Sequence, residues 1–410
     1  MSKTNTKGIK ILLVENIHAV AVERLKSEGY DVDLLPHAPS EEEYLKLLPQ
    51  YQVLGLRSKS DINQKILKAN SHLLALGAFC IGTNQIDLPV ASELGIPVFN
   101  APHSNTRSVA ELVIAEMVSL SRQLGDRNRM AHLGDWMKSA DGSREVRGKT
   151  LGIVGYGHIG SQVSVLAEAM GMKVVFYDVI KKLPLGNAVS KTRLDDLLEV
   201  SDFVTLHVPE TPETQNMFTA KQFQKMKKGS YLINASRGTV VVIDDLVIAL
   251  KENHLAGCAI DVFPTEPASN KEKFVSPLQN LKNVILTPHI GGSTEEAQYA
   301  IGLEVAESFR KFLQTGTTAG AVNFPQVDLS LKQNVTRIMN VHRNEPGVLG
   351  ELNGYISQAS ANIQAQYLST DSQIGYLVVD LEMQKAQKSS AELVQMIQSS
   401  KKSIKTRLVF

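Results

Sequence analysis

The apolar and polar positions of the first hundred residues alternate between two periods. Short apolar runs such as "IKILLVE", "YQVLGLR" and "HLLALG" are typical of buried strands, whereas "AVAVERLKSEG" and "QKILKAN" repeat their apolar positions with a helical period. Ser40 and Glu43 are spaced as a capping box at the start of a further helix. Strands that alternate with helices predict a parallel sheet with helices on both faces.

A second series of the same kind begins at "KTLGIVGYGHIG" and continues through "KVVFYD", "DFVTLHV", "SYLINAS", "LAGCAIDVF" and "NVILTPH". A long helix through "IGLEVAESFRKFL" follows it, and Ser293 and Glu296 predict a capping box at its start. Because no strand of its own follows this helix, we expect it to return to the first sheet. The first domain would then be discontinuous and comprise residues 1–104 and 293–330, with the second domain at 105–292.

The pattern changes again after the long helix. A stretch rich in Thr, Gly and Ala, "TGTTAGAVNFPQ", predicts a linker. Residues 334–410 then give strand, helix, strand, strand, helix, strand, which is the order of a ferredoxin-like α+β domain. The sequence therefore predicts an α/β chain with two doubly wound, Rossmann-like domains and a small C-terminal α+β domain.

Composition narrows the class of protein. Of the 410 residues, 43% are hydrophobic and 21% are charged, and the formal net charge of +1 gives no reason to expect a nucleic-acid partner. Cys80 and Cys258 lie far apart, which favours a reducing compartment and argues against a zinc site. The start "MSKTNTKG" lacks the apolar region of a signal peptide, and no apolar run reaches membrane length. We expect a cytoplasmic protein without a metal or a membrane partner.

The stretch "GYGHIG" carries the spacing of a dinucleotide-binding turn. Gly155, Gly157 and Gly160 follow an apolar strand and open a helix, and Asp178 ends the next strand. In that context the glycines let a pyrophosphate approach the helix N-terminus, where His158 and Ile159 also lie. The Asp178 carboxylate at the strand end can accept hydrogen bonds from the ribose hydroxyls and repels a 2′-phosphate. We therefore expect NAD as the cofactor. The adjacent Lys181 and Lys182 are the only feature that favours NADP.

Further polar residues follow three later strands. Arg237 lies in "NASRGTVV", Asp261 and Glu266 in "DVFPTEP", and His289 in "TPHIGG". The carboxyl ends of parallel strands lie at one edge of a sheet, so these side chains are candidates for a shared site.

These motifs, in this order, resemble those of the D-isomer-specific 2-hydroxyacid dehydrogenases. The resemblance implies that His289 is the acid/base, that Glu266 orients it, and that Arg237 binds the substrate carboxylate. It also implies that Asp261 holds the nicotinamide carboxamide. The same resemblance places a further set of residues along the cofactor: Ala235, Ser236, Ile290, Gly291 and Gly292.

The resemblance extends over nearly the whole chain and is closest to members that oxidise D-3-phosphoglycerate and carry one C-terminal regulatory domain. It implies substrate contacts from Arg57, Ser58, Asn105 and Gln298. Such cationic and amide donors suit a phosphorylated substrate. Two alternatives stay open at this point. One is a dehydrogenase for another D-2-hydroxy acid, such as glycerate, lactate or 2-hydroxyglutarate, and the other is a non-catalytic nucleotide-sensing protein.

The C-terminal domain resembles an ACT domain, a fold that senses amino acids. In "NVHRNEPGVLGELN" and "SANIQ", the resemblance implies that His342, Asn344 and Asn362 bind L-serine as a feedback effector. A helix N-terminus and asparagine side chains suit a small zwitterion. We expect serine to lower turnover by restraining domain motion, with the linker and Gly291–Gly292 as hinges.

Oligomerisation is also implied by resemblance. The basic stretch "RNRMAHLGDWMK" contains the only tryptophan, Trp136, and similar dehydrogenases use this region as an arm against a neighbouring subunit. ACT domains pair edge to edge. Together the two contacts would generate a homotetramer.

Overall fold

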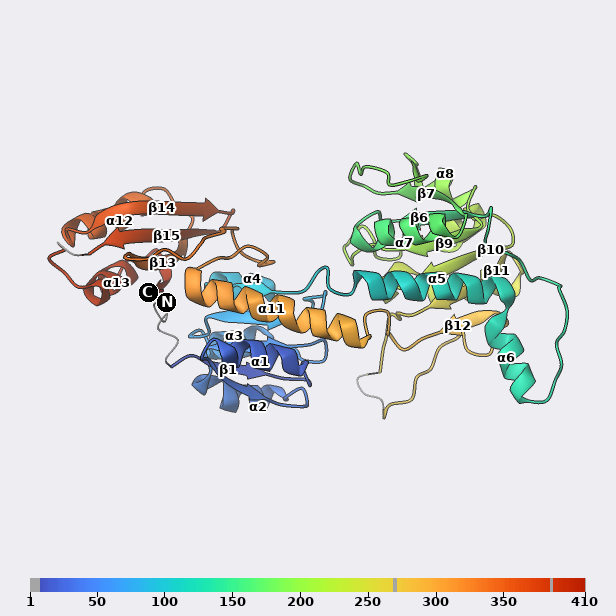
Figure 1. The fold of residues 1–410 in the computed structure, drawn as a ribbon, viewed down its shortest axis with the longest axis horizontal. Coiled ribbons are helices and arrows are strands. Elements are labelled where there is room, and N and C mark those ends of the chain that lie inside the picture. Colours follow the sequence, from blue (N-terminus) through green and yellow to red (C-terminus); the bar gives the residue numbers. More distant parts are fainter. Residues whose placement is uncertain (1–7, 268–270, 384–385, 410) are drawn as a thin grey trace. The chain divides into compact units, whose positions relative to one another are not determined.

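The computed structural model describes residues 8–267, 271–383 and 386–409. It divides the chain into two compact units (Figure 1). The first unit comprises Met1–Ser104 and Gln298–Phe410, and the second comprises Asn105–Ala297. Each unit is described on its own below.

The first unit contains a five-stranded parallel sheet with the order β2-β1-β3-β4-β5. Its strands are β1 Lys10–Leu13, β2 Asp31–Leu34, β3 Val53–Leu56, β4 Ala75–Ala78 and β5 Val98–Phe99. The connecting helices are α1 Ala19–Ser27, α2 Glu41–Leu47, the 3-10 turn Leu48–Gln50, α3 Gln64–Ala69 and α4 Leu88–Glu93. The capping box predicted at Ser40 and Glu43 is present at the start of α2.

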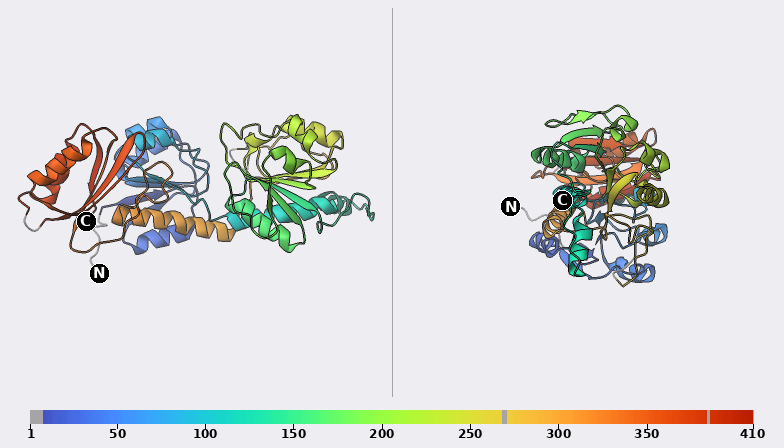
Figure 2. Two further views of the ribbon diagram at one scale, coloured as in Figure 1. Left: turned by 90° about the horizontal axis from the view of Figure 1, so that it is seen from above. Right: turned by 90° about the vertical axis from the view of Figure 1, so that its right-hand side faces the viewer.

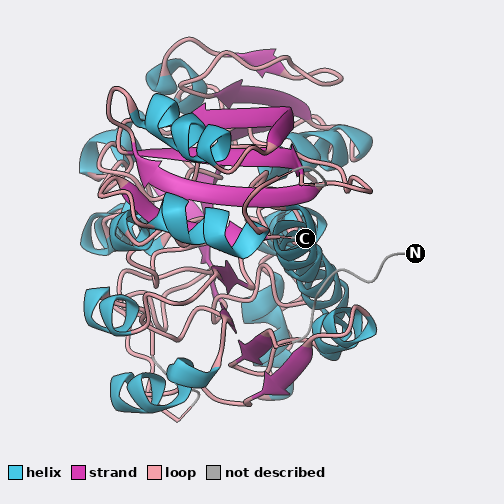
Figure 3. Ribbon diagram, turned by 90° about the vertical axis from the view of Figure 1, so that its left-hand side faces the viewer, coloured by secondary structure: helices cyan, strands magenta, loops and turns pink. Residues whose placement is uncertain are grey.

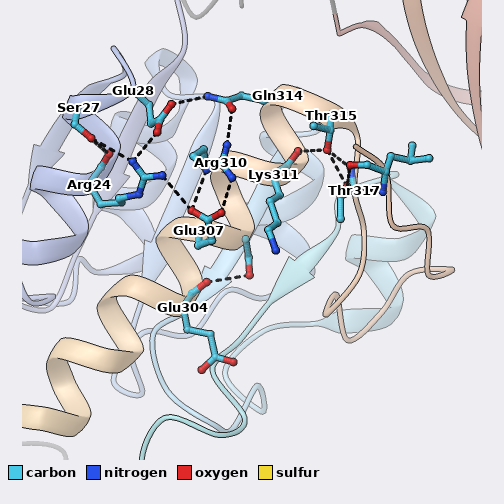
Figure 4. A network of polar contacts seen from close by, with 12 residues as sticks. Arg24, Ser27, Glu28, Glu304, Glu307, Arg310, Lys311, Gln314, Thr315 and Thr317 are labelled. Atoms are coloured by element: carbon cyan, nitrogen blue, oxygen red, sulfur yellow. Dashed lines mark hydrogen bonds and ion pairs between the residues drawn. The ribbon is translucent and has the colours of Figure 1, made fainter. Parts of the chain in front are cut away.

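The long helix α11, Glu295–Thr315, supplies apolar side chains to this sheet. It shares one face of the sheet with α1, while α2, α3 and α4 pack on the other face. A polar network links the two helices (Figure 4): Arg24 of α1 contacts Glu307 at 3.3 Å, and Gln314 Nε2 donates to Glu28 at 2.9 Å. The helix therefore returns to the first sheet, as the sequence predicted.

The start of α11 differs from the prediction by one residue. The hydroxyl of Thr294, rather than that of Ser293, accepts the N–H of Ala297 at 3.2 Å. Thr294 is also held by Ser108 at 2.8 Å, so a partner distant in sequence fixes which hydroxyl caps the helix.

A second sheet of the first unit is antiparallel and has the order β14-β15-β13-β16 (Figure 3). Its elements are β13 Thr336–Arg343, α12 Val348–Gln358, β14 Asn362–Thr370, β15 Ile374–Glu382, α13 Ser390–Gln398 and β16 Ser403–Leu408. Strand β13 pairs with β15 from Thr336↔Leu381 to Arg343↔Ile374. This is the ferredoxin-like order that the sequence predicted. The two helices cover one face of the sheet, because Leu352 and Leu393 share a cluster with strand residues.

The other face of this sheet packs into the core of the first unit. Met339, Val341, Tyr376 and Val378 belong to the same apolar cluster as Phe309 and Phe312 of α11. The two sheets of the first unit therefore share one continuous core.

The stretch predicted as a linker is part of that core, which corrects the expectation of a free hinge. Thr317 and Thr318 are 2% and 0% exposed, and their hydroxyls donate to Leu329 O at 3.1 Å and Pro325 O at 2.6 Å. The backbone then runs beside β5, where Val322 N–H donates to Val98 O at 2.8 Å. Buried backbone bonds of this kind hold a segment in place rather than let it swing.

The second unit contains a seven-stranded parallel sheet with the order β12-β11-β10-β9-β6-β7-β8. Its strands are β6 Thr150–Val154, β7 Lys173–Tyr177, β8 Val189–Ser190, β9 Phe203–Leu206, β10 Ser230–Asn234, β11 Leu255–Ile260 and β12 Val284–Leu286. Its helices are α5 Thr106–Arg122, α6 Leu124–His132, α7 His158–Ala169, α8 Leu194–Leu198, α9 Ala220–Lys225, the 3-10 turn Gly238–Val240 and α10 Ile243–Lys251.

Helices cover both faces of this sheet (Figure 2). Apolar residues of α5 and α7 form a cluster on one face, and those of α8, α9 and α10 form a cluster on the other. Within the described part of the chain, no helix combines the length and the apolar character needed to cross a bilayer. The doubly wound class predicted for this unit is confirmed, and the carboxyl ends of its strands are the place to look for a ligand site.

Candidate active site

The glycine-rich turn between β6 and α7 has the geometry of a pyrophosphate cradle. Gly155 has φ +91°, and a Cβ there would lie 2.4 Å from His207 O. A Cβ at Gly160 would lie 2.2 Å from Gly155 O. Of the three glycines of this turn, only Gly157 faces open space: a Cβ there would have no atom within 4 Å. The turn is therefore tight on its protein side and open where a phosphate would meet the N-terminus of α7, which includes His158 and Ile159.

Asp178 follows β7 beside this turn. Its Oδ2 accepts the N–H of Tyr156 at 2.8 Å, and its Oδ1 accepts the N–H of Ile180 at 2.9 Å. These two bonds fix the carboxylate next to the glycine turn. The arrangement fits a nucleotide whose ribose carries free hydroxyls, because a 2′-phosphate would meet a fixed negative charge.

His289 and Glu266 form a hydrogen-bonded pair within the second unit. Nδ1 of His289 lies 2.9 Å from Glu266 Oε2. The hydrogen bond from Glu266 is the main reason that the pKa of His289 is raised above its usual value of 6.5, against the effect of burial. Burial alone would raise the pKa of Glu266, but hydrogen bonds from His289 and from Phe263 N–H hold it below the usual value. With Nδ1 facing the carboxylate, Nε2 is the nitrogen left to exchange a proton with a substrate.

The loops after β11 and β12 bring this pair together. The N–H of His289 donates to the carbonyl of Asp261 at 2.8 Å, which joins the two loops directly. His289 has φ +54°, a left-handed conformation that is uncommon for a residue with a side chain. Glu266 Oε1 in turn accepts the N–H of Phe263 at 3.0 Å. Both partners are thus fixed by backbone bonds as well as by each other.

Arg237 follows β10 and lies close enough to both residues to influence their pKa values. Its carbonyl accepts Asn234 Nδ2 at 3.0 Å, and its Nη1 donates to Ser236 O at 2.7 Å. The next residue, Gly238, touches the loop after β11: a Cβ there would lie 2.0 Å from the carbonyl carbon of Phe263. Only glycine permits this approach, which brings the Arg237 loop against the Glu266 loop.

Asp261 organises the remaining loop. It is 1% exposed, and its Oδ1 accepts the Thr287 hydroxyl at 2.7 Å and Ile290 N–H at 2.8 Å. Its Oδ2 accepts Gly291 N–H at 2.8 Å. Beside it, a Cβ at Gly292 would lie 2.4 Å from Asn105 Nδ2, so Asn105 lies directly against this turn.

The structure therefore gathers the catalytic and cofactor candidates of the second unit at one edge of the sheet.

It also shows two residues that the sequence did not single out. Burial lowers the pKa of His207, after β9, to about 3, so this histidine is neutral. Burial, with a contribution from Asp261, raises the pKa of Glu116 on α5 to about 8. The signal for His207 was a histidine directly after a strand and two residues before Pro209. The signal for Glu116 was a glutamate in an apolar helix.

The other substrate candidates lie in the first unit. Arg57 and Ser58 follow β3, where Arg57 is half-buried and Ser58 is exposed. Gln298 lies in the first turns of α11. The loop of Arg57 and Ser58 is at the carboxyl edge of its sheet, the same edge that carries ligands in open parallel sheets.

The effector candidates lie in the C-terminal domain, His342 and Asn362 on strands and Asn344 just after β13, but they do not gather within one chain. His342 is 3% exposed, and its Nδ1 lies 3.0 Å from Asn340 Oδ1. Burial lowers the pKa of His342, which favours the neutral ring. Asn344 donates to Asp371 O at 2.6 Å, near the same end of the sheet. Asn362 pairs with Glu382 at the opposite end.

Chemically, the second unit offers a base with a tuned pKa, a fixed carboxylate partner and a cation, next to a dinucleotide turn. That set suits removal of a proton from a hydroxyl beside a carboxylate while a nicotinamide takes up a hydride.

Two family descriptions match the chain. "D-isomer specific 2-hydroxyacid dehydrogenase, NAD binding domain" matches residues 114–291, and "AHAS small subunit-like ACT domain" matches residues 338–400. The first range contains all of the second unit's candidates except Asn105 and Gly292, and the second contains all three effector candidates.

Among curated proteins, a D-3-phosphoglycerate dehydrogenase of Dictyostelium discoideum is 50% identical over 402 residues, covering 98% of this chain and 97% of the relative. One of Escherichia coli (strain K12) is 54% identical over 375 residues, covering 91% of each.

Solved structures agree with the fold. A D-lactate dehydrogenase from Aquifex aeolicus, complexed with NAD and lactic acid, is 29% identical with a TM-score of 0.67, and the match covers 77% of this chain and 100% of that one. A glyoxylate reductase from Paecilomyes thermophila is 26% identical with a TM-score of 0.69, and covers 77% and 98%.

Proposed function

The chain belongs to the D-isomer specific 2-hydroxyacid dehydrogenases and is an NAD-dependent oxidoreductase, and from this premise we propose that it oxidises D-3-phosphoglycerate to 3-phosphohydroxypyruvate. This reaction opens L-serine biosynthesis. The pair of His289 and Glu266, 2.9 Å apart beside Arg237, carries the proposal, because a nucleotide sensor needs no acid/base pair. The names of relatives that align over nearly the whole chain support the substrate.

In this reaction the Nε2 atom of neutral His289 accepts the proton of the C2 hydroxyl. Glu266 stabilises the imidazolium that forms, through the hydrogen bond at Nδ1. Arg237 binds the substrate carboxylate and polarises the C2 oxygen with a charge that does not titrate. A bound NAD would supply the acceptor for the hydride that leaves C2. The glycine turn and Asp178 would hold the dinucleotide, and Asp261 would hold its carboxamide.

We assign substrate recognition to Arg57, Ser58, Asn105 and Gln298. A phosphorylated three-carbon acid carries two anionic groups, and of these Arg237 binds only the carboxylate. Arg57 provides the further permanent cation that the phosphate requires. On this assignment residues 1–104 and 293–330 form the substrate domain, 105–292 the NAD domain and 334–410 the regulatory domain.

The test is NADH formation with D-3-phosphoglycerate and NAD, alongside D-lactate, D-glycerate and D-2-hydroxyglutarate. We expect the phosphorylated acid to give the highest kcat/KM. Higher kcat/KM with one of the other acids would move the proposal to that substrate. NADH binding without turnover of any acid would instead favour a nucleotide sensor.

L-Serine is the proposed feedback effector at His342, Asn344 and Asn362. The sheet geometry adds a condition to this proposal. His342 pairs with Gly375 of β15, whereas Asn362 pairs with Glu382, seven residues along the same strand. At roughly 3.3 Å per residue this separation is about 23 Å, too far for one serine to span.

Strand β14 lies at the edge of its sheet. Antiparallel pairing of two β14 edges about a two-fold axis brings the start of one strand to the end of the other. Asn362 of the partner subunit would then lie near His342 and Asn344. We therefore propose that each serine site is shared between two copies.

Mixing variants tests this arrangement. His342→Ala and Asn362→Ala homo-oligomers should both lose serine inhibition. Hetero-oligomers reassembled from the two variants should regain it in part, because one of the two shared sites per pair is then intact. Absence of any recovery in verified hetero-oligomers would mean that each site is built from a single chain.

A second contact would complete a homotetramer. Trp136, beyond α6, is 85% exposed, which is unusual for a tryptophan and suits an interface. We propose that this arm contacts another subunit. Sedimentation should show a tetramer for the wild type and a dimer for Trp136→Ala.

We also propose a cytoplasmic location, because Cys80 and Cys258 are both free thiols.

A further inference from the structure

Glu15 directs a buried carboxylate at the loop after β3. It lies just beyond β1, is 7% exposed, and has φ +64°, followed by Asn16 with φ +54°. Two successive side-chain-bearing residues in the left-handed region are uncommon and are retained where the surrounding structure fixes them. This turn aims the Glu15 side chain across the sheet edge rather than along the chain.

The carboxylate accepts four hydrogen bonds from that loop. Its Oε1 accepts Arg57 N–H at 3.0 Å, Ser60 N–H at 3.0 Å and the Ser60 hydroxyl at 2.6 Å. Its Oε2 accepts Lys59 N–H at 2.9 Å. The loop therefore folds around one side chain that is 42 residues away from its start in the sequence.

A buried tyrosine extends this network. Tyr44 Oη lies 2.5 Å from Ser60 Oγ, and Tyr44 is 1% exposed. Since Ser60 uses its only hydroxyl proton toward Glu15, Tyr44 must be the donor to Ser60. The hydrogen bonds thus run in one direction, from Tyr44 to Ser60 and from Ser60 to the Glu15 carboxylate.

The opposite side of Arg57 is fixed as well. Gln85 Nε2 donates to Arg57 O at 3.0 Å, so both the N–H and the carbonyl of Arg57 have fixed partners. Ser58, by contrast, is exposed, and its N–H donates to no other group in the part of the chain that the structure describes. The backbone is held from inside while the outward groups of Arg57 and Ser58 stay available.

We propose that Glu15 is a positioning residue for substrate binding: it holds the Arg57–Ser60 loop in the conformation that presents Arg57 and Ser58 to the anionic substrate. The inference rests on the proposed function, which assigns Arg57 and Ser58 to substrate recognition. Glu15 does not touch the substrate itself. It fixes the Arg57–Ser60 loop before the substrate binds. Binding then does not have to include the entropy cost of ordering this loop.

The proposal predicts a specific kinetic pattern for Glu15→Gln. The amide keeps one acceptor oxygen but turns an NH₂ group toward the loop N–H groups, so the loop shifts. KM for D-3-phosphoglycerate should rise roughly tenfold, because the Arg57 side chain is displaced. The kcat value should change less than about threefold, since His289, Glu266 and Arg237 are untouched.

A second readout follows the loop directly and needs no substrate. Hydrogen exchange of the peptide that contains residues 53–60 should be slow in the wild type and roughly tenfold faster in Glu15→Gln, since one of the two acceptor oxygens for the three N–H groups is replaced by an NH₂ group. NADH affinity should stay unchanged and confirm that the protein is folded.

Asp33→Asn is the matched control. Asp33 is also a carboxylate at a strand of this sheet, accepts the Tyr51 hydroxyl at 2.7 Å, and has no bond to the loop. Its variant should keep the wild-type KM and loop exchange. If Glu15→Gln fails to fold, Ser60→Ala is the milder change: it removes one of the four bonds and should raise KM two- to threefold.

The outcomes separate the two claims. A wild type that does not oxidise D-3-phosphoglycerate overturns the proposed function. An active wild type whose Glu15→Gln or Ser60→Ala variant keeps both KM and slow loop exchange overturns the role of Glu15. A lowered thermal stability with unchanged KM also overturns it, because Glu15 would then be structural only.

Discussion

At the scale of single residues, His289 depends on Glu266 for its charge state. The hydrogen bond between them raises the pKa of His289, so more of the imidazole is protonated at a given pH. Oxidation of a hydroxy acid requires the neutral form. The activity of the wild type should therefore rise with pH as His289 loses its proton.

Glu266→Gln should move this rise to lower pH. Without the carboxylate the pKa of His289 falls, so the acid limb of the profile of kcat/KM against pH shifts downward. The plateau should fall by about a hundredfold, because the imidazolium formed in the reaction loses its partner. The measurement is the pH dependence of kcat/KM, with the exposed Glu252→Gln as control. An unshifted acid limb would show that another group sets it.

At the scale of elements, the end of α11 is closed by side chains from the C-terminal sheet. A helix leaves its last carbonyls without partners. Here Arg407 donates to Phe312 O at 3.1 Å, Arg337 donates to Thr315 O at 3.0 Å, and Tyr376 donates to Gly316 O at 2.6 Å. The sheet thus supplies the C-cap of the longest helix of the first unit.

Arg337 can serve there only because Asp380 neutralises it. Both residues are 0% exposed, and Arg337 Nη2 lies 2.9 Å from Asp380 Oδ2. Asp380→Ala leaves a buried cation and should lower the free energy of unfolding by about 3–5 kcal/mol. Asp31→Ala, which breaks the exposed pair with Lys10, should cost less than about 1 kcal/mol. Urea unfolding monitored by circular dichroism compares the two, and equal small losses would contradict the assignment.

The sequence predicted most elements because their signals are local. Apolar periodicity located the parallel strands, and the spacing of Gly155, Gly157 and Gly160 located the cofactor turn. The errors arose where a distant partner decides the structure. Thr317 and Thr318 have the composition of a linker, but their hydroxyls find carbonyls in a folded return of the chain. Glu15 was missed because its four donors lie more than forty residues away in sequence.

At the scale of the whole molecule, the C-terminal domain is built into the first unit. Val341 and Tyr376 share an apolar cluster with Phe309, Phe312 and Phe324. Burial of aromatic side chains of this size contributes about 2–3 kcal/mol each. The C-terminal domain therefore stabilises the unit that contains it.

A truncated chain that ends at residue 333 should consequently be less stable than the full chain. Its exposed aromatic side chains should bind a hydrophobic dye, and its thermal midpoint should fall by several degrees, about 5 °C or more. Differential scanning calorimetry and dye fluorescence test this. A truncated protein with the midpoint and the KM of the full chain would show that the two parts fold independently.

The shared core also sets the terms for engineering new sensitivity into this enzyme. A foreign sensing domain fused at residue 334 would lack the two arginines and the tyrosine that bond to the carbonyls at the end of α11. It would also lack the apolar sheet face that packs against Phe312 and Phe324. A workable chimera has to exchange a larger cassette, from the last turn of α11 onward, or keep the inner face of the native sheet and redesign only its outer helices and its β14 edge. The boundary of an exchangeable C-terminal part thus lies inside α11 and not in the loop that follows this helix.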